Sequence, residues 1–347
     1  MEIIKGLGLL LGTLALFSLF SLKMPKGQKA MSGLADAAVA TFLVEAIHKY
    51  IAGGIFKINF FNQVGSAAGS MGGVAAVILV GLNLGINPVY AVAAGVAVSG
   101  YGILPGFIAG YIVALIAPRI EKVLPTGLDL IVGALVIAPF ARLLASASDP
   151  IVTLVLENIG VTINLAAEQS PLLMGFLLGG MIKMICTSPL SSMALTAMLS
   201  LQGLSMGIAA IACVGGSFTN GLIFKRLSFG DNSNVLAVML EPLTQADIIT
   251  QNPIPIYCSN FIGGGLAGLA AAYFGIINNA PGTASPIPGL LAPFGFNPAI
   301  PVIMALIFAI LGGTFAGFLG SMVFKSYKKQ TVAESEVQFN DSEIQSA

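Results

Sequence analysis

Proline and polar residues interrupt an apolar region of the chain at residues 241–253, which read E-P-L-T-Q-A-D-I-I-T-Q-N-P. Pro242 removes a backbone donor and Pro253 prevents a helix from continuing, so carbonyl groups in this segment are left without helical partners. Free carbonyl, carboxylate, amide and hydroxyl groups all bond the hydroxyl groups of a sugar or another polyol. The alternative is an interfacial loop with ordinary turn residues. We expect a solute-binding loop, with contacts from Glu241, Thr244, Gln245 and Asn252.

A second polar segment, T-S-P-L-S-S, occupies residues 187–192. A helix beginning near Pro189 would carry proline at its first position and Ser188 as its N-cap. The positive end of such a helix suits an anionic or hydroxyl-rich solute, and Lys183, one turn upstream, is a candidate charge partner. The alternative is that these hydroxyl groups bond neighbouring helices. The candidate solute contacts are Thr187, Ser188 and Ser191.

Three ionisable residues, Glu45, His48 and Lys49, lie close together in another apolar region. In an α-helix their spacing of three and four residues places all three on one face. His48 is the only histidine of the chain, and histidine changes its charge near neutral pH, which suits a proton or substrate site. A helix end at the membrane surface is the alternative. Because no second histidine or cysteine lies nearby, we expect no metal site and no cofactor.

The composition places these residues in a lipid bilayer. The chain has 347 residues, of which 56% are hydrophobic and only 9% are charged, whereas soluble domains carry about 25% charged residues. The formal net charge is zero, which gives no electrostatic footprint for nucleic acid. Broken backbone at membrane depth must be buried in protein or line a wet cavity, and ionisable residues there mark a solute path. The polar segments therefore predict a site within a membrane protein.

The apolar stretches predict an all-α, polytopic transmembrane bundle. A full span needs about 20 residues, and we expect about nine to eleven crossings. Three short pieces, residues 88–98, 189–200 and 233–250, are expected to be half-helices or re-entrant hairpins. The stretch 278–298 is too rich in proline and glycine for a span, and we expect it to fold as a loop over the solute path.

Three segments of the chain resemble enzyme IIC-type membrane proteins of the phosphotransferase system. They are K-M-I-C-T-S-P-L-S-S-M-A-L-T-A-M-L-S-L-Q-G-L-S-M-G, E-P-L-T-Q-A-D-I-I-T-Q-N-P-I-P-I and P-G-T-A-S-P-I-P-G-L. Their order and spacing are most similar to a short stand-alone group that includes proteins named as toxin-gene regulators. The resemblance covers roughly residues 30–325.

This resemblance implies a polytopic helical protein, usually a homodimer, in which re-entrant hairpins hold a sugar. Sugar-transporting relatives use a Glu-Pro pair, to which Glu241-Pro242 is similar, and a histidine, for which His48 is the candidate. The chain carries no soluble domain with a phosphorylatable cysteine or histidine. It would take part in phosphotransfer only through separate partner subunits, and whether it acts as an enzyme stays open.

We expect an enzyme IIC-like transport domain over residues 1–329. The acidic, polar composition of residues 330–347 offers too little apolar surface to fold alone, which predicts a disordered polar cytoplasmic tail. Cationic loops follow four of the apolar stretches, and placing all four in the cytoplasm leaves the C-terminus inside. We therefore expect a multi-pass protein of the bacterial cytoplasmic membrane.

Two other functions compete with that of a sugar permease. An ion-gradient-driven transporter of a small polar or anionic solute would use His48 or Glu45 as its coupling group. A membrane sensor or regulator would bind a ligand without transporting it. The sequence does not name the solute.

Overall fold

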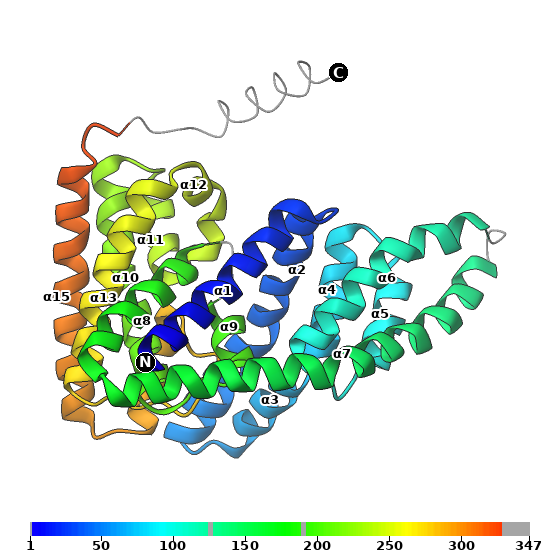
Figure 1. The fold of residues 1–347 in the computed structure, drawn as a ribbon, viewed down its shortest axis with the longest axis horizontal. Helices are drawn as coiled ribbons and strands as arrows, with labels where there is room; N and C mark the ends of the chain where they lie inside the picture. Colours follow the sequence, from blue (N-terminus) through cyan, green and yellow to red (C-terminus); the bar gives the residue numbers. More distant parts are fainter. Residues whose placement is uncertain (1, 124–127, 189–191, 328–347) are drawn as a thin grey trace. The chain divides into compact units, whose positions relative to one another are not determined.

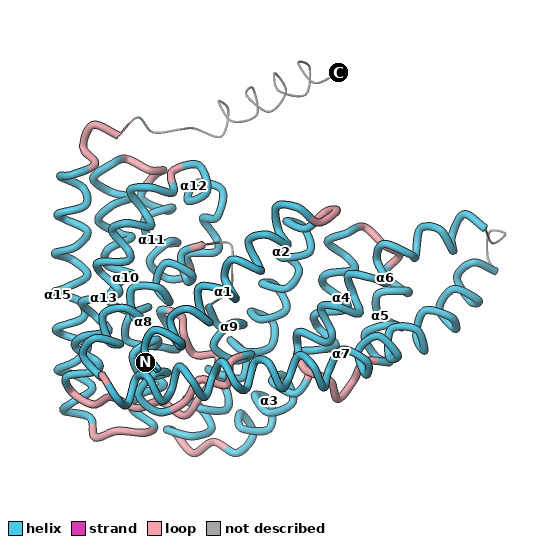
Figure 2. Tube along the Cα trace, viewed as in Figure 1, coloured by secondary structure: helices cyan, strands magenta, loops and turns pink. Residues whose placement is uncertain are grey.

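The computed structural model describes residues 2–123, 128–188 and 192–327, and the predicted tail of residues 330–347 lies outside them. The described residues form helices joined by loops, with no strand among them (Figure 2). The predicted all-α, polytopic class is therefore confirmed.

The chain forms two compact units. The first contains Met1–Gln169, Leu190–Met206 and Asn279–Thr283. The second contains Ser170–Pro189, Gly207–Asn278 and Ala284–Ala347. Each unit is described by itself below.

Most helices of the first unit come from the N-terminal half of the chain (Figure 1). They are α1 (Glu2–Lys23), α2 (Gly27–Ala38), the π-helices η1 (Val39–Leu43) and η2 (Ala46–Ile55), α3 (Asn59–Ser70), α4 (Gly72–Leu84), α5 (Pro88–Ala97), α6 (Ile103–Val123), α7 (Leu128–Gln169) and α9 (Ser192–Met198).

The core of the first unit forms where α4 packs against α2, α5 and α6, and where α7 covers α5 and α6. Small residues allow the backbones of α4 and α6 to approach closely, because a Cβ atom at Gly106 would lie 2.3 Å from the carbonyl oxygen of Gly73. Close contact through small residues is how helices associate in lipid, where hydrophobic burial provides no drive.

Helix α5 confirms that the piece predicted at 88–98 is too short to span a bilayer. It has ten residues, with Pro88 at its first position and the side chain of Asn87 accepting a bond from the N–H of Val89 at 2.8 Å. At its other end, Arg142 of α7 donates to the carbonyl oxygen of Ala97 at 2.7 Å. A cation at a helix C-terminus satisfies orphan carbonyls and opposes the negative end of the helix dipole.

Replacing Arg142 by methionine is expected to destabilise the first unit. The variant keeps the apolar stem but removes the donor that closes α5, and a lost hydrogen bond to a charged group costs about 1–3 kcal/mol. Arg119, which is exposed on α6, provides the matched control as Arg119→Met. Thermal unfolding in detergent would measure both, and equal melting temperatures for the two variants would contradict the capping role.

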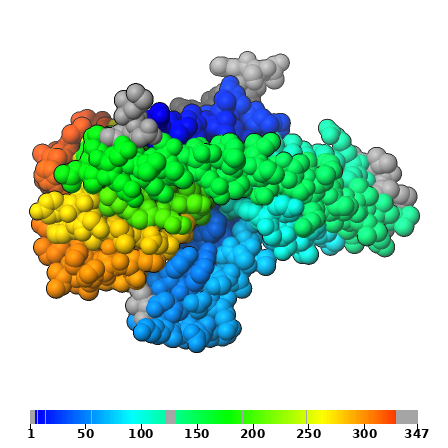
Figure 3. Space-filling model, turned by 60° about the horizontal axis from the view of Figure 1, so that its bottom comes forward, coloured from blue at the N-terminus to red at the C-terminus, as the bar shows by residue number. Residues whose placement is uncertain are grey.

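Helix α7 is the longest element of the chain, with 42 residues and with Pro139 and Pro150 inside it. The apolar stretches 128–147 and 151–166, separate in the sequence analysis, are joined here into one continuous helix. Many of its large apolar side chains are exposed, and Figure 3 shows it as a green ridge on the surface of the first unit.

The second unit is built around α13 (Pro253–Tyr273), which packs against α8 (Pro171–Thr187) on one side and α15 (Ala299–Val323) on another. The remaining elements are α10 (Gly203–Leu227), most of which belongs to this unit, α11 (Asn232–Leu240), the 3-10 helices η3 (Pro242–Gln245) and η4 (Ala292–Gly295), α12 (Ala246–Gln251) and α14 (Pro286–Leu291).

Six helices in the described part are long and apolar enough to cross a membrane, or up to seven if the bent pair α3 and α4 is one span. The short pieces predicted at 88–98 and 189–200 contain α5 and α9, and the piece predicted at 233–250 contains α11, η3 and most of α12. None of these helices is among the six. Shorter apolar segments are Gly8–Lys23, Pro88–Ala97 and Pro171–Thr187. The full number of nine to eleven crossings stays a prediction.

Candidate functional site

The backbone breaks at Glu241, as the proline-rich sequence predicts. Helix α11 ends at Leu240, Glu241 is extended with φ −148° and ψ 100°, and Pro242 opens η3. The Glu241 carboxylate accepts a long bond of 3.4 Å from the N–H of Leu243, and its carbonyl accepts from the Thr244 hydroxyl at 2.7 Å. Among the described residues, this long bond is the hydrogen bond that holds the carboxylate, which leaves it capacity for further hydrogen bonds.

Gln245 and Asn252 hold the same segment in place. The Gln245 carbonyl Oε1 accepts from Asn234 Nδ2 at 2.7 Å, which ties η3 to α11. The buried Asn252 donates to the carbonyl of Ile248 at 3.1 Å, at the point where α12 ends and α13 begins. Both side chains thus bond to protein groups that shape the loop.

A fully buried lysine lies on α8, the helix that packs against η3. The Lys183 ammonium donates to the carbonyl of Cys213 at 3.5 Å and contacts the sulfur of Cys186 at 4.0 Å. Within the described ranges, Lys183 forms no ion pair. Two glycines make room for the aliphatic part of the Lys183 side chain. A Cβ atom at Gly216 would lie 2.2 Å from Lys183 Cε, and a Cβ atom at Gly264 would lie 2.3 Å from Lys183 Cβ.

A chain of buried polar side chains continues from Lys183 across three helices. The Thr187 hydroxyl donates to the Lys183 carbonyl at 3.0 Å and accepts from Asn220 Nδ2 at 3.5 Å. Asn260 Nδ2 donates to Asn220 Oδ1 at 2.5 Å. Asn260 Oδ1 and Ser259 Oγ are buried with no hydrogen-bond partner among the described residues. We call Lys183, Thr187, Asn220 and Asn260 the buried polar chain.

Burial raises the pKa of Glu241, which lies outside the six candidate spans, to about 7. The thiol of Cys186 acts in the same direction, while the Leu243 N–H and the ammonium of Lys183 act in the opposite one. Lys183 is therefore within electrostatic range of the Glu241 carboxylate, and the two groups belong to one polar region of the second unit.

The described part of the other polar segment is the end of α8. Ser188 closes that helix, and its hydroxyl donates back to the carbonyl of Ile185 at 2.8 Å. The predicted helix start at Pro189 lies outside the described residues and stays a prediction. The extended backbone of Ser188 follows a helix that has already run to Thr187. Ser191 and Pro189 lie outside the described residues.

Glu45 lies between the two π-helices of the first unit. Its carboxylate pairs with Lys49 at 2.7 Å, and the Lys49 ammonium lies 5.2 Å from the centre of the Tyr50 ring. The carboxylate also presses against α3, because a Cβ at Gly69 would lie 2.1 Å from Glu45 Oε2. The predicted helix is present here, and Lys49 lies on the same face as Glu45. Its turns are widened into π-helices through most of residues 39–55, which the sequence did not indicate.

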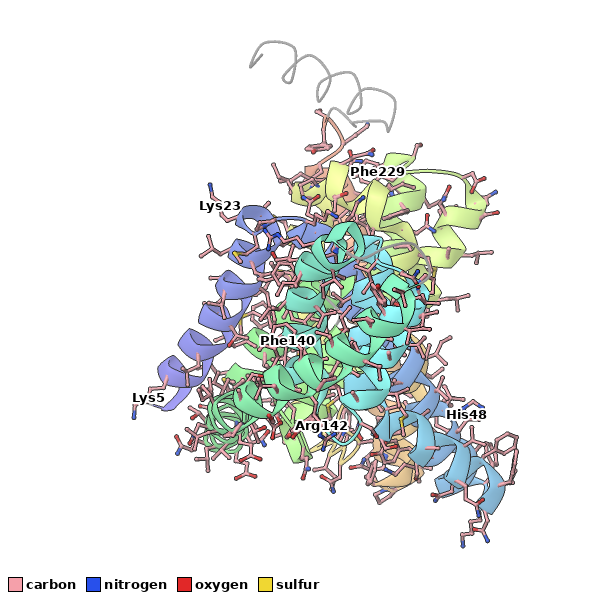
Figure 4. All side chains as sticks on the ribbon, turned by 90° about the vertical axis from the view of Figure 1, so that its right-hand side faces the viewer. Lys5, Lys23, His48, Phe140, Arg142 and Phe229 are labelled. Carbon is pink, nitrogen blue, oxygen red and sulfur yellow. The ribbon has the colours of Figure 1, made fainter. Side chains whose placement is uncertain are left out.

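His48 has a local role in this structure. Its Nδ1 lies 3.0 Å from the carbonyl of Val44, and its ring lies 5.4 Å from that of Phe61 on α3. Figure 4 shows His48 on the hairpin that η2 and α3 form. Its predicted place in a solute site stays a prediction.

A cavity of about 330 Å³ lies within the first unit, beside Glu45. Its lining combines carboxylates, hydroxyl groups and aromatic rings with apolar side chains. The lining residues are Phe42, Glu45, Tyr50, Gly102, Ile103, Leu104, Pro105, Val152, Thr153, Leu156, Glu157, Ala197, Met198, Ser200 and Pro281. His48 is not among these described residues.

The predicted site residues therefore form two groups. The second unit contains Glu241, Thr244, Gln245, Asn252, Thr187 and Ser188. The first unit contains Glu45 and His48. Sequence analysis missed Glu157 and Tyr50 of the cavity, and Asn220 and Asn260 of the buried polar chain. An amide side chain within an otherwise apolar helix, as at Asn220 and Asn260, was the signal available for the second pair.

Within the described part, no three His, Cys, Asp or Glu side chains gather closely enough to hold a metal ion. A family model described as Phosphotransferase system, EIIC, matches residues 28–336. No curated protein sequence and no solved structure matches the chain.

Proposed function

Because the chain belongs to the EIIC family of the phosphotransferase system, we propose that it is a permease that binds and translocates a sugar or sugar-like solute. The family match over residues 28–336 is the observation that carries this proposal. The apolar helices of both units are consistent with a multi-pass membrane protein.

The region around Glu241 is the proposed solute-binding loop. Its carboxylate is held by a single long bond from Leu243, and a carboxylate oxygen is a strong acceptor for a sugar hydroxyl. Thr187 and Asn260 provide further polar groups in the same unit, and Asn260 Oδ1 still has no partner within the described residues. Thr244 supports the loop through the Glu241 carbonyl.

Separate proteins of the phosphotransferase system are the proposed source of phosphate. Such a partner would phosphorylate the sugar while the permease holds it, so the permease itself would make and break no covalent bond. We also propose that the protein is a homodimer of the cytoplasmic membrane with its C-terminus in the cytoplasm, which agrees with Lys225 and Arg226 lying at the end of a candidate span.

Uptake into membrane vesicles tests this function. Vesicles carrying the protein would receive a panel of labelled hexoses and hexosamines, with and without phosphoenolpyruvate and the soluble phosphotransferase proteins. Uptake that needs these components and yields phosphorylated sugar inside would support the proposal.

Two other results would contradict the proposed function. Uptake that ignores phosphoenolpyruvate and stops when the ion gradient collapses would identify a secondary transporter. Binding without uptake, in vesicles where insertion has been verified, would identify a sensor.

A further inference from the structure

Two buried cysteines of the second unit lie on neighbouring helices. Cys186 is in the last turn of α8, and Cys213 is within α10. A hydrogen bond joins their side chains, so the two sulfur atoms are close neighbours in the fold. Both cysteines carry free thiols in this structure. Two thiols in contact across a pair of helices can be oxidised to a disulfide, because that bond needs its two cysteines close together.

Other contacts hold α8 against α10 around this pair. The Lys183 ammonium lies 4.0 Å from Cys186 Sγ and donates to the carbonyl of Cys213 at 3.5 Å, so one ammonium contacts both cysteines. Asn220 of α10 donates to the hydroxyl of Thr187 at 3.5 Å, one residue beyond Cys186. The positions of the two thiols are therefore fixed by several contacts between the same two helices.

The surroundings of Cys186 favour its reaction with an oxidant. The thiolate is the reactive form of cysteine, and a neighbouring ammonium such as that of Lys183 stabilises it. Cys186 also lies one residue before the end of α8 at Thr187, and helix ends open locally at a low cost in free energy. Such opening admits a small oxidant to the buried sulfur. It also lets the sulfur move to the disulfide bond length of about 2.05 Å.

The thiol pair is coupled to the proposed solute-binding loop. The Cys186 thiol and the Lys183 ammonium both act on the Glu241 carboxylate, in opposite directions, and η3, which follows Glu241, packs against α8. Oxidation removes the Cys186 thiol from the partners of the ammonium and leaves the Glu241 carboxylate as a charged group within its electrostatic range. A carboxylate attracted to Lys183 has less capacity to accept hydrogen bonds from a solute.

We propose that Cys186 and Cys213 are a redox modification site, where a peroxide forms a disulfide between α8 and α10 and thereby weakens solute binding at Glu241. The proposal rests on the proposed function and names a regulation of its Glu241 site. In a reducing compartment such a disulfide is transient and serves as a sensor. Exchange with other thiols then restores the two cysteines.

The oxidation balances with one molecule of hydrogen peroxide. The Cys186 thiolate attacks one peroxide oxygen, an S–O bond forms as the O–O bond breaks, and the leaving hydroxide takes up the proton that Cys186 lost, which gives water and a sulfenic acid. The Cys213 sulfur then attacks the sulfenic sulfur, the S–S bond forms as the S–O bond breaks, and the leaving hydroxide takes the Cys213 proton. The two thiols lose two electrons and two protons, and the peroxide becomes two waters.

Thiol mapping in the Cys258→Ser variant tests the modification. Cys258 is the third cysteine of the chain and is exposed on α13, so its removal leaves the pair alone. The purified, full-length variant would be treated with hydrogen peroxide, denatured, alkylated with N-ethylmaleimide and analysed by mass spectrometry. We expect both thiols to disappear together into two peptides linked through Cys186 and Cys213 of one copy, and dithiothreitol to restore them.

Three results of this mapping would overturn the modification site. They are the loss of one thiol alone, a link between two copies of the chain, and two alkylated thiols at peroxide concentrations that oxidise Cys258 in the wild type.

Vesicle uptake tests the regulation. In the Cys258→Ser protein, phosphoenolpyruvate-dependent uptake at a subsaturating sugar concentration should fall about tenfold after peroxide treatment, because a charged acceptor of the solute is weakened. Dithiothreitol should restore it. The soluble phosphotransferase proteins would be added after the peroxide has been removed, so that their own thiols are not oxidised. Cys213→Ala in the same background should make uptake insensitive to peroxide, and Cys213→Ser provides a second variant if the alanine protein does not fold.

The outcomes distinguish this inference from the function on which it rests. Normal uptake without any disulfide would overturn the redox site and leave the permease standing. A disulfide that does not change uptake, or equal peroxide sensitivity in Cys213→Ala, would overturn the regulation of Glu241 and also leave the permease standing. A disulfide in a protein that takes up no sugar of the panel when reduced would support the modification site and reject the permease together with its regulation.

Discussion

Glu241→Ala is expected to abolish sugar binding and uptake while leaving the protein folded. A carboxylate that accepts two sugar hydroxyls contributes about 1.5–3 kcal/mol for each bond, so affinity should fall by about 100-fold or more. The fold should survive, because within the described ranges the carboxylate makes one long bond, to the N–H of Leu243 at 3.4 Å. Binding to purified protein and vesicle uptake would both be measured.

Glu168→Ala serves as the control for this prediction, since it removes an exposed carboxylate from α7 of the first unit. Wild-type affinity in Glu241→Ala would remove Glu241 from the solute site. Loss of folded protein instead would assign Glu241 to holding η3.

The raised pKa of Glu241 gives its role a pH signature. With a pKa of about 7, the carboxylate is mostly protonated one unit below that value and mostly ionised one unit above it. If the ionised form accepts the sugar, affinity should rise between about pH 6 and about pH 8 in the wild type and stay flat in Glu241→Gln. A pH profile that Glu241→Gln does not alter would exclude this carboxylate as the titrating group.

The effect of the same shift on stability has the opposite sign. Folded Glu241 holds its proton more tightly than the unfolded residue, whose pKa is 4.5. The stability that comes from this tighter proton binding is therefore fully present below about pH 4.5. It is lost as the pH rises through about 7. Binding and stability should thus respond to pH in opposite directions.

Lys183→Met is expected to reduce uptake strongly and to increase stability. The ammonium is fully buried, and its partners among the described residues are a carbonyl at 3.5 Å and a sulfur at 4.0 Å. Burying a charge that has no ion-pair partner is costly, so an apolar side chain of similar length should raise the free energy of unfolding by about 1 kcal/mol or more. Uptake should fall by about tenfold or more if this charge acts on the solute or on Glu241.

Lys29→Met, at an exposed lysine of α2, is the control for Lys183→Met. Thermal unfolding and vesicle uptake would be measured for both. A less stable Lys183→Met protein would show that Lys183 holds α8 and α10 together. A more stable protein with normal uptake would show that the charge has no part in transport.

The sequence was most informative where single residues determine the backbone. Pro242 predicted the break at Glu241, because a missing N–H acts locally. The apolar stretches likewise predicted the all-α class. Chain breaks and apolar character depend on near neighbours, so they could be inferred without knowing the packing.

The cavity could not be predicted for the opposite reason. Its lining comes from segments as distant in sequence as Phe42, Glu157, Ser200 and Pro281, and only tertiary packing brings them together. The π-helices were also missed, since a widened turn leaves the apolar pattern almost unchanged over a few residues. His48 attracted attention as the only histidine, yet its ring bonds a carbonyl of its own helix, which rarity alone does not reveal.

The length of α7 has a consequence for how the first unit meets the lipid. At about 1.5 Å per residue, its 42 residues extend for about 63 Å, roughly twice the hydrocarbon thickness of about 30 Å. If all of its exposed apolar side chains are to lie in lipid, the helix would incline by about 60° from the bilayer normal. A rod this oblique responds to hydrophobic mismatch by changing its inclination, so a thicker bilayer would rotate α7 toward the normal.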